Sequence, residues 1–180
     1  MATVYFTRHG QTVWNVERKI CGATDIELTE LGYEQATELA NKIKEENIKI
    51  DQILYSPLVR AADTAKRISE ITGIPAKPEE RLREQCFGKY EGTARRGEEF
   101  QAAKLHFIDS YENGETMLHL AQRIYNLLDD VKKDSERTYL LVAHNGIARV
   151  VRSYFEDMTN EEYAGYGIRN CEIIKFDFED

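Results

Sequence analysis

Residues 3–10 read TVYFTRHG, a short run of β-forming residues that ends in a basic turn with a histidine. We predict a strand over residues 3–7, because β-branched and aromatic residues in alternation are typical of strands. Two further apolar runs, over residues 52–56 and 138–143, also end in polar turns. A last strand is predicted over residues 171–178, where Ile174, Phe176 and Phe178 alternate with polar residues.

Helical periodicity fills the intervals between these runs. The spacing of apolar residues predicts helices over residues 31–46, with Thr29 as the N-cap, and over residues 57–68, 117–131 and 147–155. Pro57 is expected in the first turn of its helix. Strands that alternate with helices favour a parallel sheet covered on both faces. We therefore predict an α/β fold, namely a single three-layer α/β/α domain with a mostly parallel central sheet, over residues 1–180.

The composition narrows the class of function. The 180 residues are 42% hydrophobic and 31% charged, which is an ordinary balance for one globular domain. The formal net charge of -8 disfavours nucleic acid and anionic lipid as partners, so an anionic ligand needs a local basic pocket. The sequence contains neither an apolar run long enough for a bilayer nor a signal-peptide pattern. We therefore expect a cytoplasmic protein without a membrane partner.

The three cysteines are scattered along the chain at Cys21, Cys86 and Cys171, without a C-x-x-C pair. This pattern favours reduced thiols over a disulfide framework or a zinc site. No cysteine begins a C-x5-R loop either, which argues against a cysteine-based phosphatase.

Polar residues follow three of the predicted strands at the point where each strand ends. Arg8 and His9 follow the first strand, Arg60 lies shortly after the second, and His144 follows the strand over residues 138–143. In α/β sheets, ligands bind outside the carboxyl ends of the strands. Arginine forms forked hydrogen bonds to phosphate oxygens, and helices that begin after Pro57 and His144 would add amide donors. The sequence therefore predicts a phosphate-binding crevice that contains two imidazoles.

The residue types in this crevice suit phosphoryl transfer. A neutral imidazole can attack phosphorus, while the two arginines and a protonated His144 would stabilise charge on the transferring group. The leaving oxygen of an alkyl ester also needs a proton, which a buried carboxylic acid can supply. The segment 80–88 offers Glu84 for this role, and on motif grounds we prefer it to Glu79 or Glu80.

Ordered motifs along the chain resemble one known family. They read TRHGQTVWN (7–15), CGATD (21–25), LTELG (28–32), SPLVRAADTA (56–65), LRE (82–84) with FGKYEG (87–92), GET (114–116) and VAHNG (142–146). The set covers almost the whole chain and resembles the signature of the histidine phosphatase superfamily, also called the phosphoglycerate mutase-like family. RHG alone is a weak signal, whereas the full ordered set is specific.

The resemblance implies roles for individual residues. His9 would be the phosphorylated nucleophile, and Glu84 would donate a proton to the leaving group and then activate water. The residues that would bind the transferring phosphoryl group are Arg8, Asn15, Arg60 and His144. Gln11 and Gly22 would line the substrate side. The family needs no metal for this chemistry, so we expect neither a metal nor another cofactor.

Two departures from the family pattern concern the substrate. Asn145 stands where many members have glycine, so it adds a side chain beside the pocket. The stretch 93–111 matches no pattern of the family, although this region usually caps the pocket. Arg95 and Arg96 lie there and could grip a second anionic group, but we favour solvated charges for both.

Three functions fit these residues. The leading hypothesis is a phosphomonoesterase for a small phosphorylated metabolite, such as a sugar phosphate, a phosphoglycerate or the nucleoside-like phosphate of cobamide assembly. A phosphoglycerate mutase would have to shield its phosphohistidine from water with longer insertions and a tail, and the sequence stops about where the last strand ends, so we favour hydrolysis. The third hypothesis is a non-catalytic module that binds a phospholigand or docks a protein. A homodimer is left open.

Overall fold

Five strands form one sheet in the order β3-β2-β4-β1-β5. They are β1 (Thr3–Arg8), β2 (Gln52–Tyr55), β3 (Ala76–Pro78), β4 (Tyr139–Ala143) and β5 (Ile173–Asp177). Every neighbouring pair is parallel except β1 and β5, which run antiparallel. The structure is a computed structural model that describes residues 2–179. It confirms the predicted α/β fold with a mostly parallel sheet.

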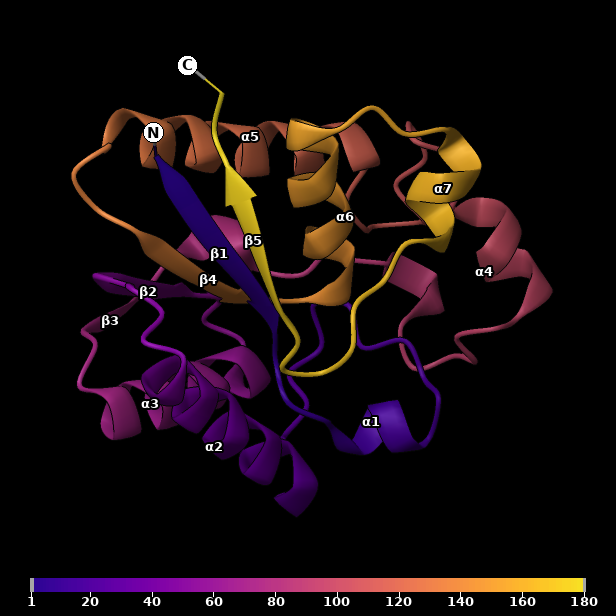
Figure 1. The fold of residues 1–180 in the computed structure, drawn as a ribbon. Helices are drawn as coiled ribbons and strands as arrows, with labels where there is room; N and C mark the ends of the chain where they lie inside the picture. Colours follow the sequence, from indigo (N-terminus) through magenta and orange to yellow (C-terminus); the bar gives the residue numbers. More distant parts are fainter. Residues whose placement is uncertain (1, 180) are drawn as a thin grey trace.

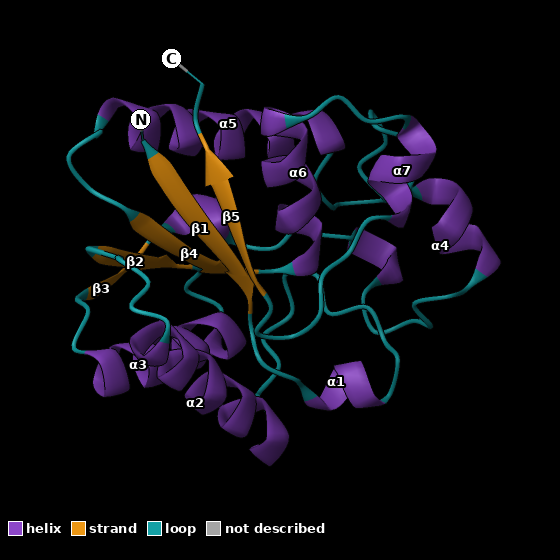
Figure 2. Cartoon of the chain, viewed as in Figure 1, coloured by secondary structure: helices purple, strands orange, loops and turns teal. Residues whose placement is uncertain are grey.

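Helices cover both faces of the sheet (Figure 1). On one face lie α2 (Glu30–Glu45) and α3 (Val59–Thr72), and on the other lie α5 (Met117–Lys133) and α6 (Asn145–Phe155). Figure 2 shows the short helices beyond the carboxyl end of β1, namely α1 (Val13–Val16), α4 (Glu98–Ala103) and α7 (Asn160–Gly165). Two 3-10 turns, η1 (Glu80–Leu82) and η2 (Gly88–Tyr90), lie between β3 and α4. Within residues 2–179, no helix has the length and apolar character that a membrane span requires.

Strand β4 lies at the centre of the core. Its residues are all buried, and successive side chains point to opposite faces of the sheet. Leu140 and Val142 pack with α2 and α3, whereas Leu141 and Ala143 pack with α5 and α6. A strand buried on both faces reads as a continuous apolar run, which explains why residues 138–143 were recognisable.

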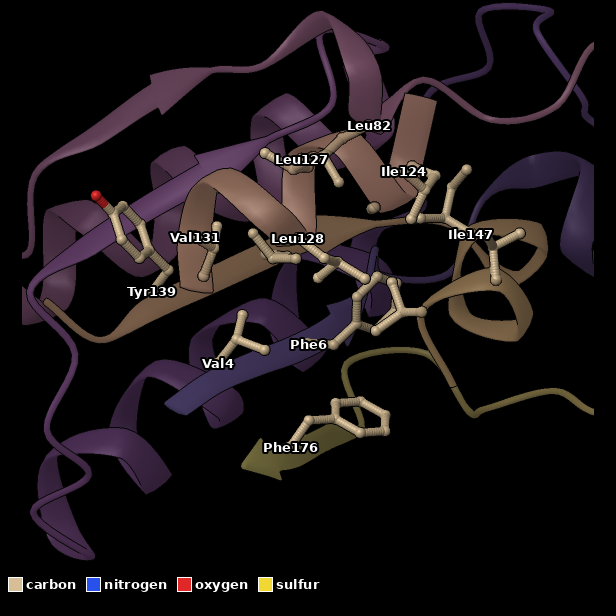
Figure 3. Close-up of a cluster of buried hydrophobic side chains, with 14 of the residues drawn as sticks. Val4, Phe6, Leu82, Ile124, Leu127, Leu128, Val131, Tyr139, Ile147 and Phe176 are labelled. Atoms are coloured by element: carbon tan, nitrogen blue, oxygen red, sulfur yellow. The ribbon is translucent and has the colours of Figure 1, made fainter. Parts of the chain in front are cut away.

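The apolar stripe of α5 faces the sheet, as its periodicity predicted. Figure 3 shows Ile124 and Leu128 of this helix above Phe6 of β1, with Phe176 of β5 below Phe6. Thr116 caps the helix through a hydrogen bond of 3.2 Å from the backbone N–H of His119 to its hydroxyl oxygen. Burial of each large side chain here contributes about 1.5–3 kcal/mol.

Helix α3 and strand β3 differ from the prediction, and the short helices α1, α4 and α7 were not predicted. Helix α3 begins at Val59, so the expectation that Pro57 occupies its first turn is wrong. The start is set from outside the helix, because the Val59 N–H donates to the carboxylate of Asp25 at 2.7 Å. Strand β3 was not predicted. It has only three residues and ends at Pro78, and proline in a strand is confined to edges, which is where β3 lies.

Candidate active site

The ends of β1 and β4 bring two histidines together. Arg8 pairs with Ala143 in the sheet register, and the N–H of His9 donates to the carbonyl of Ala143 at 3.0 Å. His144 follows directly, and the ring centroids of His9 and His144 lie 5.3 Å apart. Beside them opens a cavity of about 710 Å³ lined by His9 and by the predicted Arg8, Asn15, Gly22, Arg60, Glu84 and Asn145.

His9 is held in one tautomer. Its Nδ1 lies 2.7 Å from the carbonyl oxygen of Gly10, and a carbonyl only accepts, so Nδ1 carries the proton. Nε2 therefore keeps its lone pair. Burial, then the charges of Arg60 and Arg8, hold the pKa of His9 well below its usual value. The ring is neutral at neutral pH, which is the form that can attack phosphorus.

His144 is fully buried behind His9. Its Nε2 lies 2.7 Å from the hydroxyl of Ser56. Burial, then the positive charge of Arg60, lowers the pKa of His144 well below its usual value. Burial beside two arginines therefore disfavours a further positive charge on the ring of His144 in the free site, and the role of a protonated His144 during phosphoryl transfer stays a prediction. The negative charge of a bound phosphate dianion would raise the pKa of His144.

The two arginines are fixed by backbone carbonyls. Arg8 donates from Nη1 to the carbonyl of Ile168 at 3.0 Å. Arg60, which is 1% exposed, donates to the carbonyls of Thr24 at 2.8 Å and Gly22 at 2.6 Å. Burial lowers the pKa of Arg8 to about 10, so it stays cationic at neutral pH.

Three buried nitrogens of the arginines and of His144 have no hydrogen-bond partner within residues 2–179. They are the Nε atoms of Arg8 and Arg60 and the Nδ1 atom of His144. A buried donor without an acceptor costs about 1–3 kcal/mol, and an oxyanion among the arginines would supply the missing acceptors. The site is therefore built for an anion.

Glu91 supports the loop that holds Arg60. Its carboxylate accepts hydrogen bonds from the N–H groups of Ala23 at 2.9 Å, Thr24 at 3.0 Å and Phe87 at 3.0 Å, and from the Thr24 hydroxyl. Gly22 has a φ of +52°, and a Cβ there would meet the same carboxylate. This packing presents the carbonyls of Gly22 and Thr24 to Arg60.

Glu84 is the carboxylate of the segment 79–84 that reaches the cavity. One oxygen accepts from the Gln85 N–H at 2.9 Å, and the other accepts from the Gly146 N–H at 2.9 Å. Glu79 and Glu80 are engaged elsewhere, in ion pairs of 2.8 Å with Arg81 and Arg83 respectively. The structure thus separates the three candidate acids and places Glu84 at the site.

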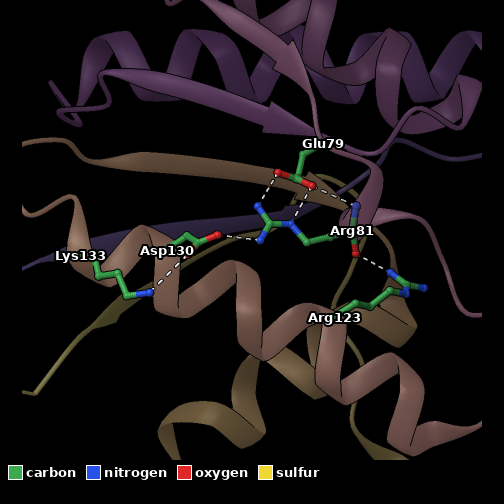
Figure 4. Close-up of polar contacts among 5 residues, drawn as sticks. All are labelled: Glu79, Arg81, Arg123, Asp130 and Lys133. Atoms are coloured by element: carbon green, nitrogen blue, oxygen red, sulfur yellow. Dashed lines mark hydrogen bonds and ion pairs between the residues drawn. The ribbon is translucent and has the colours of Figure 1, made fainter.

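Helix α5 anchors the chain just before Glu84 (Figure 4). The guanidinium of Arg81 pairs with Glu79 and with Asp130 of α5, each at 2.8 Å. Arg123 of α5 donates to the backbone carbonyl of Arg81, and Lys133 pairs with Asp130 at 3.5 Å. These contacts tie η1 to the helix, so Glu84 extends from a supported backbone.

Of the other predicted site residues, Asn15 and Asn145 line the cavity and Gln11 does not. Asn15 lines the cavity while its Oδ1 accepts from the Thr12 N–H at 3.2 Å, as part of the cap of α1. Asn145 lines it too, and its Oδ1 accepts from the Ile168 N–H at 3.0 Å. Gln11 lies outside the lining, because its Oε1 accepts from the hydroxyl of Thr29 at 3.0 Å.

Sequence reasoning missed several residues at the site. Asn170 donates to the backbone carbonyl of His9 at 2.8 Å and to Oδ1 of Asn15 at 3.3 Å, and no local pattern announced it. Arg149 lines the cavity from α6, one helical turn after Asn145, a spacing that could have revealed it. The cationic side chains that line the cavity are Arg8, Lys19, Arg60, Arg95, Arg96, Lys104 and Arg149.

No group of three metal-ligating side chains comes together among residues 2–179. The donors at the cavity are instead arginine, lysine and imidazole nitrogens, with two carboxylates, those of Glu84 and Glu161. Such a set recognises oxyanions.

A family model described as the histidine phosphatase superfamily (branch 1) matches residues 4–180. The chain belongs to the histidine phosphatase superfamily. The predicted resemblance is thereby confirmed, and the protein is a phosphatase-type enzyme of this family. In this histidine phosphatase, Arg8, His9 and Arg60 line the cavity, and the ring centroid of His144 lies 5.3 Å from that of His9.

Relatives of this histidine phosphatase carry phosphatase and mutase names. It is 34% identical over 159 residues to a Hydrogenobacter thermophilus protein named "Putative phosphoserine phosphatase 2". The aligned region covers 84% of this chain and 77% of that relative. It is 30% identical to a "Probable phosphoglycerate mutase GpmB" of Erwinia tasmaniensis, over 99% of this chain and 86% of the relative. The solved phosphoserine phosphatase of Entamoeba histolytica in complex with 3-phosphoglyceric acid is 30% identical, with a TM-score of 0.84 and coverage of 99% and 91%.

Proposed function

We propose that this histidine phosphatase hydrolyses a small phosphomonoester through a phosphohistidine on Nε2 of His9. The observation that carries the proposal is the hydrogen bond from Nδ1 to the Gly10 carbonyl, which leaves Nε2 as the nucleophilic nitrogen beside the arginines. The same bond would stabilise the ring when Nε2 becomes phosphorylated, because Nδ1 keeps its proton throughout.

The reaction proceeds in two steps. Nε2 of His9 attacks phosphorus, the bond from phosphorus to the ester oxygen breaks, and the carboxyl group of Glu84 gives a proton to the leaving alcohol. Water then attacks the phosphohistidine, Glu84 takes a proton from that water, and phosphate leaves with His9 restored. Arg8, Arg60 and His144 surround the transferring group, where their unpartnered nitrogens would donate to its oxygens.

The names of the relatives guide the choice of substrate. A phosphoserine phosphatase and a structure bound to 3-phosphoglyceric acid are among them, so three-carbon phosphorylated acids are the first substrates to test. The relatives named as phosphoglycerate mutases favour a second candidate, transfer of the phosphoryl group between two positions of phosphoglycerate. Both reactions use the same phosphohistidine.

The test compares His9→Ala with His119→Ala, which changes an exposed histidine outside the cavity. With p-nitrophenyl phosphate in EDTA, we expect turnover by the wild type and His119→Ala, and a loss of about a thousandfold or more in His9→Ala. Labelled substrate should leave an acid-labile phosphoryl group on His9. Formation of 2-phosphoglycerate from 3-phosphoglycerate with little phosphate release would support the mutase instead. Silence of the wild type on a broad panel of esters would favour a binding module and refute the proposal.

A further inference from the structure

Gly10 follows His9 in the turn after β1, and its carbonyl sets the tautomer of that histidine. Nδ1 of His9 donates to this carbonyl oxygen at 2.7 Å. The position requires a glycine, because a Cβ there would overlap the backbone of Gly32 in α2. Glycine also has the most backbone freedom of any residue, so contacts from elsewhere in the chain must fix the direction of this carbonyl.

Four hydrogen bonds hold the backbone on either side of the peptide group that joins Gly10 to Gln11. The Gly10 N–H donates to the buried hydroxyl of Thr64 at 3.0 Å, and the Gln11 carbonyl accepts from the Thr29 N–H at 2.9 Å. The other two involve the N–H and the carbonyl of His9, whose partners are Ala143 and Asn170. None of the four involves the Gly10 carbonyl or the Gln11 N–H, which make up the joining peptide itself.

Gln35 of α2 holds this joining peptide from its other side. The Gln11 N–H donates to Oε1 of Gln35 at 2.8 Å. Within residues 2–179, this bond and the one from His9 are the two hydrogen bonds of the joining peptide. The N–H and C=O of a trans peptide point in opposite directions, so an acceptor for the Gln11 N–H keeps the Gly10 carbonyl turned toward the imidazole. Hydrogen bonds in series also polarise one another, which strengthens the carbonyl as an acceptor.

Rotation of the joining peptide would reverse the chemistry of His9. The Gln11 N–H would then face Nδ1, which would have to accept, so the ring proton would move to Nε2. Nε2 would have no lone pair left for an attack on phosphorus. Protonation of both nitrogens offers no escape, because burial, then the charges of Arg60 and Arg8, hold the pKa of His9 well below its usual value. The direction of one peptide group therefore decides whether His9 is nucleophilic.

We propose that Gln35 is a positioning residue, which keeps His9 in its nucleophilic tautomer by holding the peptide between Gly10 and Gln11. Gln35 does not line the cavity at His9, so it acts through the backbone and touches no substrate. The inference rests on the proposed function for the role of Nε2 as the nucleophile. The tautomer itself is a property of the free protein.

The test removes the acceptor while it keeps the length of the side chain. Gln35→Met has no acceptor oxygen, Gln35→Glu retains one, and Glu38→Met is the matched control, since Glu38 is exposed about one turn further along α2. NMR of the imidazole nitrogens at neutral pH reports the tautomer without turnover, and His9→Ala assigns the signals. We expect the wild type, Gln35→Glu and Glu38→Met to carry the proton on Nδ1. In Gln35→Met the ratio of the two tautomers should move about tenfold toward a proton on Nε2, the effect of one lost hydrogen bond.

Kinetics separates this positioning role from general support of the pocket. Single-turnover measurements with p-nitrophenyl phosphate follow the phosphorylation of His9, and its rate constant should fall about three- to tenfold in Gln35→Met. The inhibition constant of inorganic phosphate should stay within about twofold, because Arg8 and Arg60 keep their own backbone partners. Gln35→Glu should restore the rate constant to nearly that of the wild type.

Two results would overturn the role of Gln35. One is a tautomer ratio that Gln35→Met leaves unchanged. The other is a loss of phosphate affinity in this variant as large as its loss of rate, which would make Gln35 a support of the pocket and not of the nucleophile. Inactivity of the wild type on every ester would refute the proposed phosphatase instead, and the NMR spectra of the free protein would still decide whether Gln35 fixes the tautomer.

Discussion

Gly146→Ala should damage catalysis while leaving the fold nearly intact. Gly146 lies in the first turn of α6, where alanine is normally the better helix former by about 1 kcal/mol. A Cβ at this position would, however, overlap Oε1 of Glu84 and lie 3.0 Å from its Cδ. The carboxylate is the far end of a flexible side chain, so it can swing away at little cost in stability. Its hydrogen bond of 2.9 Å from the Gly146 N–H would then be lost or lengthened.

The expected effect depends on the leaving group. Restoring ordinary van der Waals contact moves the carboxylate by about 1 Å, and a misplacement of that size costs on the order of a hundredfold in rate. We expect this loss in kcat for an alkyl phosphate such as 3-phosphoglycerate, which is about 2.7 kcal/mol in barrier. p-Nitrophenolate leaves without a proton, so its ester should lose only a few-fold. Steady-state kinetics with both substrates, beside Glu84→Gln and a thermal melt, would measure this.

Two results would refute the reasoning. If Gly146→Ala keeps its kcat for alkyl phosphates within about threefold, the carboxylate of Glu84 is not the proton donor or its position does not matter. If both substrates slow equally, the substitution acts on the phosphate-binding side and not on the leaving group.

Three further predictions concern the support of the site and the stability of the fold. Glu91→Gln weakens the four hydrogen bonds that order the loop around Arg60, so KM for phosphate esters should rise about tenfold in steady-state assays, and an unchanged KM would contradict this role. Because the pKa values of His9 and His144 are lowered in the folded protein, the unfolded chain binds more protons than the folded one below pH 6.5. The free energy of unfolding should therefore fall by about 1.4 kcal/mol per pH unit for each histidine as the pH drops. Denaturant titrations at several pH values should show a shallower dependence of this free energy on pH for His9→Gln. Leu128→Ala, at a position that is 0% exposed, should cost about 2–5 kcal/mol by denaturation, whereas Leu118→Ala, at 57% exposed, should stay within about 0.5 kcal/mol.

The central sheet could be predicted because its signal is local. The run at residues 138–143 is apolar throughout, and a strand buried on both faces produces that pattern within five or six residues. The polar turn after it was equally visible, which is why His144 could be assigned to the crevice. Helix α7 had a readable signal as well, because Thr159 and Glu162 form a capping box, although the prediction did not use it.

The rest of the site depends on contacts between distant parts of the chain. Asn170 reaches the carbonyl of His9 across 161 positions, and nothing in its neighbours marks it. Gln11 stands in a family motif, yet it turns toward the cap of α2 instead of the cavity. The protonation of His144 follows from burial beside several charges, which only the assembled structure defines.

Seven of the 24 lysines and arginines line the cavity at His9, whereas only two of the 32 acidic residues do, namely Glu84 and Glu161. The rest of the surface is therefore more acidic than the formal charge of -8 suggests. It repels an approaching phosphate ester until the ester reaches the opening of the cavity. Dilute salt shortens the range of that repulsion to about 10 Å at 0.1 M, while charges inside the cavity are screened less. We therefore expect kcat/KM for a phosphate ester to rise when a low concentration of inert salt is added. An enzyme with a broadly basic surface would show a fall in kcat/KM instead.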